Sequence, residues 1–146
     1  MELSVSHLGI CVSDLVRSVR FYTEALDFTV AERHAIGRDF AALMELDDVV
    51  LDSQFLRRGD LTIELLCFVE PAPVGPAERR GINQLGLTHL SVRTDDLAAA
   101  MAAVEAAGGS VVAGTETTIS AGGTDLRFVY CTDPDGVRIE LMDFGG

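Results

Sequence analysis

The chain carries the same pattern twice, and this repeat limits its fold more than any other feature. Two similar strand-forming stretches, LTIELLCF and VRIELMDF, each have a glutamate near the centre, Glu64 or Glu140. Upstream of them, HLGICVSDL begins at His7 and HLSVRTDDL begins at His89. His89 follows His7 by 82 positions, whereas Glu140 follows Glu64 by 76, so the first copy is longer by six residues. Such a repeat predicts two structural units of the same kind.

Each copy predicts the order strand, helix and three strands, so we expect an α+β protein built from two tandem βαβββ modules. The first module spans 1–69 and the second 86–146, joined at 70–85 by a Pro- and Arg-rich linker. The six additional residues fall in the first module, where DFAALMEL at 39–46 predicts a short inserted helix.

The expected elements follow from periodicity, capping residues and turn residues. Ser13 or Asp14 is expected to cap the first helix, and Asp95 stands at the start of the second. The turns DPDG at 133–136 and RRGD at 57–60 predict hairpins. The expected spans are strands at 4–12 and 87–93, helices at 14–26 and 95–107, strands near 28–34 and 110–117, and hairpins of 49–56 with 61–68 and of 125–132 with 137–144.

The charge of the chain excludes several classes of function. The formal net charge is −12 over 146 residues, and this field opposes contact with nucleic acid or an anionic membrane. All 11 basic residues are arginine, which excludes Schiff-base chemistry and a P-loop lysine. The longest apolar run is too short to span a bilayer, and the N-terminus does not resemble a signal peptide. We therefore expect a cytoplasmic protein.

The three cysteines, Cys11, Cys67 and Cys131, are an odd number without the spacing of a metal site. We interpret them as reduced, buried thiols.

Strand alternation predicts that the repeated polar residues share a face of each module. Ile63 and Leu65 alternate with Glu64, and the second copy has the same alternation around Glu140. For a single residue a solvated sheet face is sufficient explanation. The matched set is different, because two imidazoles and two carboxylates suit a divalent ion such as Zn, Ni, Co, Mn or Fe. The predicted ligands are His7, Glu64, His89 and Glu140.

These residues resemble the vicinal oxygen chelate superfamily, which includes glyoxalase I, methylmalonyl-CoA epimerase, type I extradiol dioxygenases and bleomycin-resistance proteins. The resemblance rests on HLGICVSDLVRSVRFYTEALDF, IELLCF, GLTHLSVRTDDL and DPDGVRIELMDF. It implies that the mixed sheets of the two modules curl into a U-shaped cleft. It also implies that the first and last strands of each module hold the metal through the four residues named above.

The resemblance implies a metal-dependent isomerase or lyase of the glyoxalase or epimerase type. A substrate with adjacent oxygens would bind the ion, and a proton would be transferred next to a carbonyl through a metal-bound enolate. The base would be Glu140 or Glu64, or, in an epimerase-like enzyme, a separate acid such as Glu45 or Asp47. Arg138, on the face of Glu140, would bind a substrate carboxylate or lie at an exposed strand end. A homodimer is the expected assembly.

Two alternative functions remain open at this level. An Fe(II) extradiol ring-cleaving dioxygenase would need only His7, His89 and Glu140. A non-catalytic small-molecule binding protein of the bleomycin-resistance kind would need none of the ligands. The presence of Glu64 favours the four-ligand, redox-neutral branch.

Overall fold

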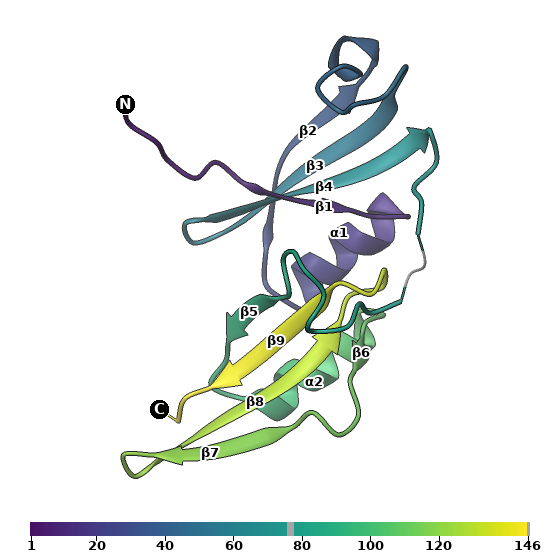
Figure 1. The fold of residues 1–146 in the computed structure, drawn as a ribbon. Coiled ribbons are helices and arrows are strands. Elements are labelled where there is room, and N and C mark those ends of the chain that lie inside the picture. The colour runs from purple at the N-terminus through teal and green to yellow at the C-terminus, as the bar shows by residue number, and fades with distance from the viewer. Residues whose placement is uncertain (76–77, 146) are drawn as a thin grey trace. The chain divides into compact units, whose positions relative to one another are not determined.

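The structure is a computed structural model that describes residues 1–75 and 78–145 (Figure 1). The chain divides into two compact units, one formed by Met1–Thr23 with Asp27–Gly75 and the other by Glu24–Leu26 with Pro76–Gly146. Each unit contains one open sheet and one α-helix, so the predicted α+β class is confirmed. The boundaries predicted for the modules and the linker, and the curling of the sheets into one cleft, stay predictions.

The first unit has the predicted order of strand, helix and three strands. Its sheet has the order β1-β4-β3-β2, in which β1 runs parallel to β4 and the other pairs are antiparallel. Its elements are β1 (Leu8–Cys11), α1 (Leu15–Glu24), β2 (Thr29–Ile36), the 3-10 helix η1 (Arg38–Phe40), β3 (Val50–Arg58) and β4 (Leu61–Glu70). The predicted hairpin of 49–56 with 61–68 corresponds to β3 and β4.

The second unit repeats this arrangement with one additional strand. Its sheet has the order β5-β9-β8-β6, and β7 pairs with β8 as well. Its elements are β5 (Leu90–Arg93), α2 (Leu97–Ala106), β6 (Ser110–Val111), β7 (Thr117–Ala121), β8 (Thr124–Thr132) and β9 (Arg138–Asp143). The single strand predicted near 110–117 is wrong, because the chain turns at Gly114, whose φ is 77°, and separates β6 from β7.

The first strand of each unit begins later than predicted, so the spans 4–12 and 87–93 are too long. Leu8 is opposite Ile63 in a parallel pair, and β4 begins only two residues before Ile63. Leu90 is likewise opposite Ile139, one residue after β9 begins. The partner strands begin at Leu61 and Arg138, so they extend only one or two residues past these pairs and cannot pair with the whole predicted spans. His7 and His89 consequently lie immediately before β1 and β5 rather than within them.

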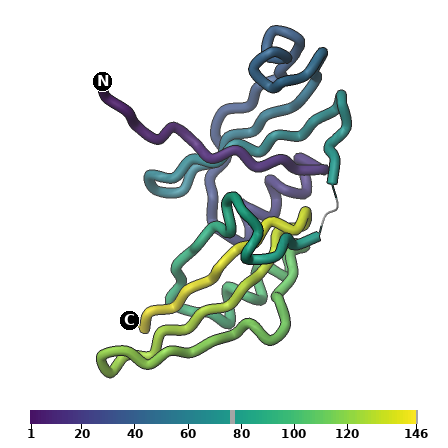
Figure 2. The backbone as a smooth tube through the Cα atoms, viewed as in Figure 1, coloured from purple at the N-terminus to yellow at the C-terminus, as the bar shows by residue number. Residues whose placement is uncertain are grey.

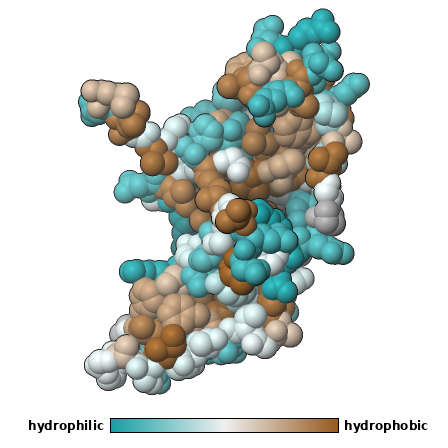
Figure 3. Space-filling view, viewed as in Figure 1, coloured by the Kyte–Doolittle hydropathy of each residue, from teal (hydrophilic) through white to brown (hydrophobic). Residues whose placement is uncertain are grey.

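The N-terminal residues 1–7 form no part of the sheet and extend away from it (Figure 2). Their apolar side chains are exposed, Met1 by 110%, Leu3 by 81% and Val5 by 94% of the reference area. Figure 3 shows the corresponding hydrophobic colour along this segment.

The inserted segment at 39–46 does not form the predicted short helix over its whole length. It consists of the 3-10 turn η1 followed by hydrogen-bonded turns, and it closes where the amide of Leu46 donates to the carbonyl of Ala41 over 3.0 Å. Glu45 has a φ of 59°, the left-handed conformation that ends a helix. Ala41 packs with Val49 and Leu51 in a small apolar cluster of its own.

The two faces of each sheet differ as the alternation predicts. Ile63 and Leu65 are fully buried, whereas Glu64 between them points to the opposite face and is partly exposed. In the second unit Ile139 and Leu141 are buried in the same way, and α2 contacts β8 and β9. The polar residues of interest therefore lie on the face opposite the apolar one. Within the described ranges no helix is long and apolar enough to cross a membrane.

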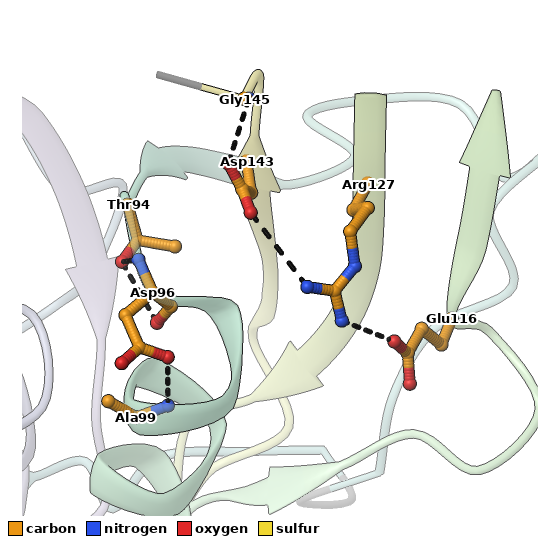
Figure 4. Close-up of polar contacts among 7 residues, drawn as sticks. All are labelled: Thr94, Asp96, Ala99, Glu116, Arg127, Asp143 and Gly145. Atoms are coloured by element: carbon orange, nitrogen blue, oxygen red, sulfur yellow. Dashed lines mark hydrogen bonds and ion pairs between the residues drawn. The ribbon is translucent and has the colours of Figure 1, made fainter. Parts of the chain in front are cut away.

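Asp96, rather than the predicted Asp95, caps α2. Its Oδ1 accepts a hydrogen bond of 2.9 Å from the amide of Ala99, and Thr94 supports the same turn (Figure 4). In the first helix Asp14 takes this role by accepting from the amide of Arg17. Figure 4 also shows Arg127 of β8 between Glu116, which directly precedes β7, and Asp143 of β9, with an ion pair to each.

Replacement of the cap gives a test of this assignment. We expect Asp96→Ala to lower the free energy of unfolding by about 1 kcal/mol, since an unpaired helix amide is left without its acceptor. Thermal unfolding measured by circular dichroism is the assay. The matched control Asp95→Ala is expected to change the free energy of unfolding much less than Asp96→Ala does. An equal loss in both variants would contradict the assignment of Asp96 as the cap.

The interpretation of all three cysteines as buried is wrong for two of them. Cys131 is fully buried, Cys67 is partly buried and Cys11 is exposed. Burial, with a smaller contribution from the charge of Glu105, raises the pKa of the Cys131 thiol from 9.0 to about 11.

The thiols should therefore react in order of exposure. At pH 8 we expect a thiol reagent such as DTNB to modify Cys11 rapidly and Cys131 only after unfolding, because the thiolate is the reactive form. The raised pKa also favours the folded state while the unfolded thiol stays protonated. That contribution is lost as the pH rises above 9.0 towards 11. Rapid modification of Cys131 in the folded protein, followed by mass spectrometry, would contradict this order.

Candidate metal centre

The first unit brings His7 and Glu64 together at the start of the parallel pair β1–β4, at one edge of its sheet. Gly9 is opposite Glu64 in the β1–β4 register, which places the side chain of His7, two residues earlier, beside the carboxylate. Nε2 of His7 lies 3.1 Å from Oε2 of Glu64. The side chains are 35% and 12% exposed, so the pair is accessible from solvent.

Two further side chains fix this pair. The buried hydroxyl of Ser53 on β3 donates to Oε1 of Glu64. Phe55, directly opposite Glu64 on β3, contacts the imidazole of His7 edge-on, with ring centroids 5.2 Å apart. Both oxygens of Glu64 are therefore engaged, one by Ser53 and the other by His7.

The second unit contains the equivalent pair. Nε2 of His89 lies 3.4 Å from Oε2 of Glu140, and these side chains are 27% and 17% exposed. Tyr130 is opposite Glu140 on β8 and contacts the imidazole of His89 at 5.6 Å, the position that Phe55 has in the first unit. The hydroxyl of Ser91 donates to the same oxygen, Oε2, that faces His89.

The other ring nitrogen of each histidine is also occupied. Nδ1 of His7 lies 3.0 Å from the hydroxyl of Ser6, and Nδ1 of His89 lies 2.9 Å from the hydroxyl of Thr88. Each imidazole is thus held on both sides, with Nε2 directed to the carboxylate.

The donor chemistry of the two pairs suits a divalent ion. Each pair presents one imidazole nitrogen and one carboxylate oxygen at the same point, a set that Zn, Mn, Fe, Co and Ni accept. The polar groups that orient these ligands are of the kind found around metal sites in proteins. Within residues 1–75 and 78–145, no three His, Cys, Asp or Glu side chains form a group that could hold an ion. Each unit by itself therefore offers two ligands.

The geometry of Arg138 differs from that of a solvent-facing substrate ligand. Its side chain is only 7% exposed, and its guanidinium donates to the carbonyl oxygens of Arg80 over 2.6 Å and Thr88 over 3.5 Å. It also stacks at 5.3 Å over Tyr130. Arg138 anchors the segment that leads into His89, and its binding of a substrate carboxylate stays a prediction.

His34 lies on the same sheet face as Glu64. It is opposite Ser53 in the β2–β3 register, and its ring contacts Phe55 at 5.8 Å. The apolar cluster beneath the inserted segment continues along this face, because Leu66 packs against it two residues after Glu64. The surroundings of the first pair are therefore partly aromatic and apolar.

Sequence reasoning missed the residues that hold the two pairs, although most of them leave a signal. A hydroxyl residue directly precedes each repeated histidine, as Ser6 and Thr88, and an aromatic residue stands nine or ten positions before each glutamate, as Phe55 and Tyr130. Ser53 and Ser91 leave no such signal, because they reach their carboxylates from different strands.

Comparison with known proteins gives the same family. The sequence model of the Glyoxalase/Bleomycin resistance protein/Dioxygenase superfamily matches residues 4–141. The protein YaeR of Escherichia coli (strain K12) is 31% identical over 140 residues, which cover 95% of both chains. This chain therefore belongs to the Glyoxalase/Bleomycin resistance protein/Dioxygenase superfamily, as the sequence motifs predict.

Solved structures support the same fold. A glyoxalase family protein from Bacillus cereus matches with a TM-score of 0.84 at 18% identity, covering 100% of this chain and 97% of that one. Glyoxalase I from Zea mays matches with a TM-score of 0.66 at 20% identity, covering 96% of this chain and 44% of that one. The fosfomycin resistance protein FosX from Listeria monocytogenes, solved with Mn(II) and sulfate, matches with a TM-score of 0.62 at 14% identity, covering 98% and 93%. At these identities the likeness shows the fold alone.

Proposed function

We propose that this protein is a metal-dependent lyase or isomerase of the glyoxalase type, which moves a proton at a carbon next to a substrate carbonyl. The observation that carries the proposal is the His–Glu pair that recurs in both units. We propose His7, Glu64, His89 and Glu140 as the ligands of one divalent ion. The likeness to glyoxalase I and to the Mn(II) complex of FosX supports this choice of chemistry.

When bound, such an ion supplies Lewis-acid polarisation of the substrate carbonyl. The carboxylates of this chain then perform the proton transfer. In a glyoxalase-type reaction, one carboxylate takes the proton from the carbon next to the carbonyl and returns it to the neighbouring carbon. In an epimerase, one carboxylate takes the proton from one side of that carbon and the other, in its protonated form, delivers a proton to the opposite side. The proposed substrate is a small molecule with two adjacent oxygens.

Glu140 is the better candidate for the base. Its Oε2 accepts from Ser91 and faces His89, while its Oε1 receives no hydrogen bond from the part of the chain that the structure describes. Both oxygens of Glu64 are engaged, by Ser53 and His7. A carboxylate with one uncommitted oxygen accepts a proton more readily, because no existing hydrogen bond has to be broken.

Proton exchange in D₂O tests the proposed reaction. Metal-loaded protein would be incubated with α-hydroxycarbonyl compounds, hemithioacetals of methylglyoxal and substituted malonyl thioesters, and deuterium incorporation followed by NMR. We expect exchange at the carbon next to the carbonyl of at least one class, abolished by a chelator. Oxygen uptake with catechols in place of exchange would contradict the redox-neutral assignment.

We also propose a homodimer, and mixing two variants decides whether the ligands come from one chain or two. One variant carries His7→Ala and the other His89→Ala, and the two are unfolded and refolded together. Recovery of metal binding in the mixture supports ligands shared between chains, and no recovery supports ligands from one chain.

Light scattering of the wild type measures the assembly directly, and a monomer would contradict the proposed homodimer. The cytoplasmic location stays a prediction.

A further inference from the structure

The residue before each histidine contacts the imidazole through a hydroxyl group, and this group is neither a proposed metal ligand nor a proposed base. Ser6 reaches Nδ1 of His7 over 3.0 Å, and Thr88 reaches Nδ1 of His89 over 2.9 Å. Both hydroxyl residues are exposed, so these bonds contribute little to stability in competition with water. Their recurrence at the same place in both units needs a different explanation.

The chemistry of imidazole supplies one. A neutral histidine has one N–H, and only the nitrogen without hydrogen can bind a metal ion. Nε2 lies 3.1 Å from a carboxylate oxygen in the first unit and 3.4 Å in the second, and this proximity favours a hydrogen on Nε2 whenever no ion is bound. A metal ion bound at Nε2 requires the hydrogen on Nδ1 instead. The partner of Nδ1 must therefore donate in one state and accept in the other.

A hydroxyl group can do both, whereas a backbone carbonyl or a carboxylate only accepts. We propose that Ser6 and Thr88 are positioning residues that hold each imidazole in either tautomer. The hydroxyl donates to Nδ1 while Nε2–H faces the glutamate, and accepts from Nδ1–H once Nε2 becomes a ligand. This inference rests on the proposed metal-binding function, and it concerns the side chains of this chain rather than the identity of the ion.

The choice of variants follows from the shape of the side chains. Thr88→Val removes the hydroxyl at nearly constant volume, and Thr88→Ser retains the hydroxyl as a matched control. Ser6→Ala and Ser6→Thr form the equivalent pair at the first histidine. The carbonyl of Thr88 that accepts from Arg138 belongs to the backbone and is kept in each variant.

The first readout is metal affinity, measured by competition titration with Zn²⁺ or Co²⁺. We expect Thr88→Val to weaken binding by about tenfold, the range seen when a residue that orients a metal ligand is lost. Thr88→Ser is expected to remain within about threefold of the wild type. Equal affinities for Thr88→Val and the wild type would overturn the proposal.

The second readout is the tautomer itself, from ¹⁵N chemical shifts of the histidine rings in metal-free protein at constant pH. In the wild type we expect the hydrogen on Nε2 of His7 and His89. In Thr88→Val the ¹⁵N shifts of His89 should move towards those of a mixture of the Nδ1–H and Nε2–H tautomers, while those of His7 stay unchanged. Unchanged shifts for His89 would overturn the proposal. Because this arm needs no metal, it separates failure of the hydroxyl role from failure of the proposed function.

Discussion

Glu140→Gln is expected to lower the rate of proton exchange by at least about a hundredfold, the lower end of what a positioned general base contributes. Glutamine keeps the shape and one ligating oxygen but accepts a proton far less readily. Within the described residues Oε1 of Glu140 accepts no hydrogen bond, so we expect a larger loss of exchange rate in this variant than in Glu64→Gln. The measurement is deuterium incorporation into the substrate at saturating metal concentration.

Glu64→Gln is the matched control for this prediction. Ser53 and His7 engage both oxygens of Glu64, so its substitution should reduce the exchange rate much less once metal is saturating. Metal content measured in both variants separates loss of the base from loss of the ion. A larger loss in Glu64→Gln than in Glu140→Gln, at equal metal content, would reverse the assignment.

Removal of either histidine is expected to have the second large effect, on metal binding. We expect His7→Ala and His89→Ala each to weaken binding of a divalent ion by at least about a hundredfold. Loss of residues that merely orient a ligand already costs ten- to a hundredfold, and these two are proposed as direct ligands. Competition titration against a chromophoric chelator measures the change.

His34→Ala is the control for the histidine variants. His34 contacts Phe55 on the same face, yet in the described part of the chain no carboxylate lies within ion-pair distance of it. Its substitution should leave metal affinity unchanged. A comparable loss in His34→Ala would mean that histidine content, rather than the repeated pair, determines binding.

Much of the fold follows from the sequence because the repeat supplies two independent readings of each element. Alternation around Glu64 and Glu140 predicts the buried and polar faces, and the DPDG turn predicts the hairpin of β8 and β9. The predictions fail where turns interrupt a segment whose residue pattern suggests one continuous element. The strand expected at 110–117 breaks at Gly114, and the segment 39–46 continues from the 3-10 helix η1 into hydrogen-bonded turns in place of a helix over its whole length.

The candidate site is less completely encoded. The two His–Glu pairs are recognisable because each residue recurs at its matched position in the repeat. Ser53 and Ser91 are not recognisable, since they reach Glu64 and Glu140 from strands that alternation alone does not place in register. Arg138 is a residue whose environment the sequence does not predict. Its position in the strand predicts a solvent-facing guanidinium, whereas tertiary contacts bury it against the carbonyls of Arg80 and Thr88.

The central claim is that the repeated His–Glu pairs hold one divalent ion, and elemental analysis tests it most directly. Protein purified without chelator, and reloaded with Mn²⁺, Co²⁺, Ni²⁺ or Zn²⁺ if necessary, would be measured by inductively coupled plasma mass spectrometry beside the His7→Ala/His89→Ala double variant. The account predicts one tightly held ion per chain in the wild type and none in the variant. Absence of a stoichiometric ion from the reloaded wild type, or equal metal content in the two proteins, would contradict it.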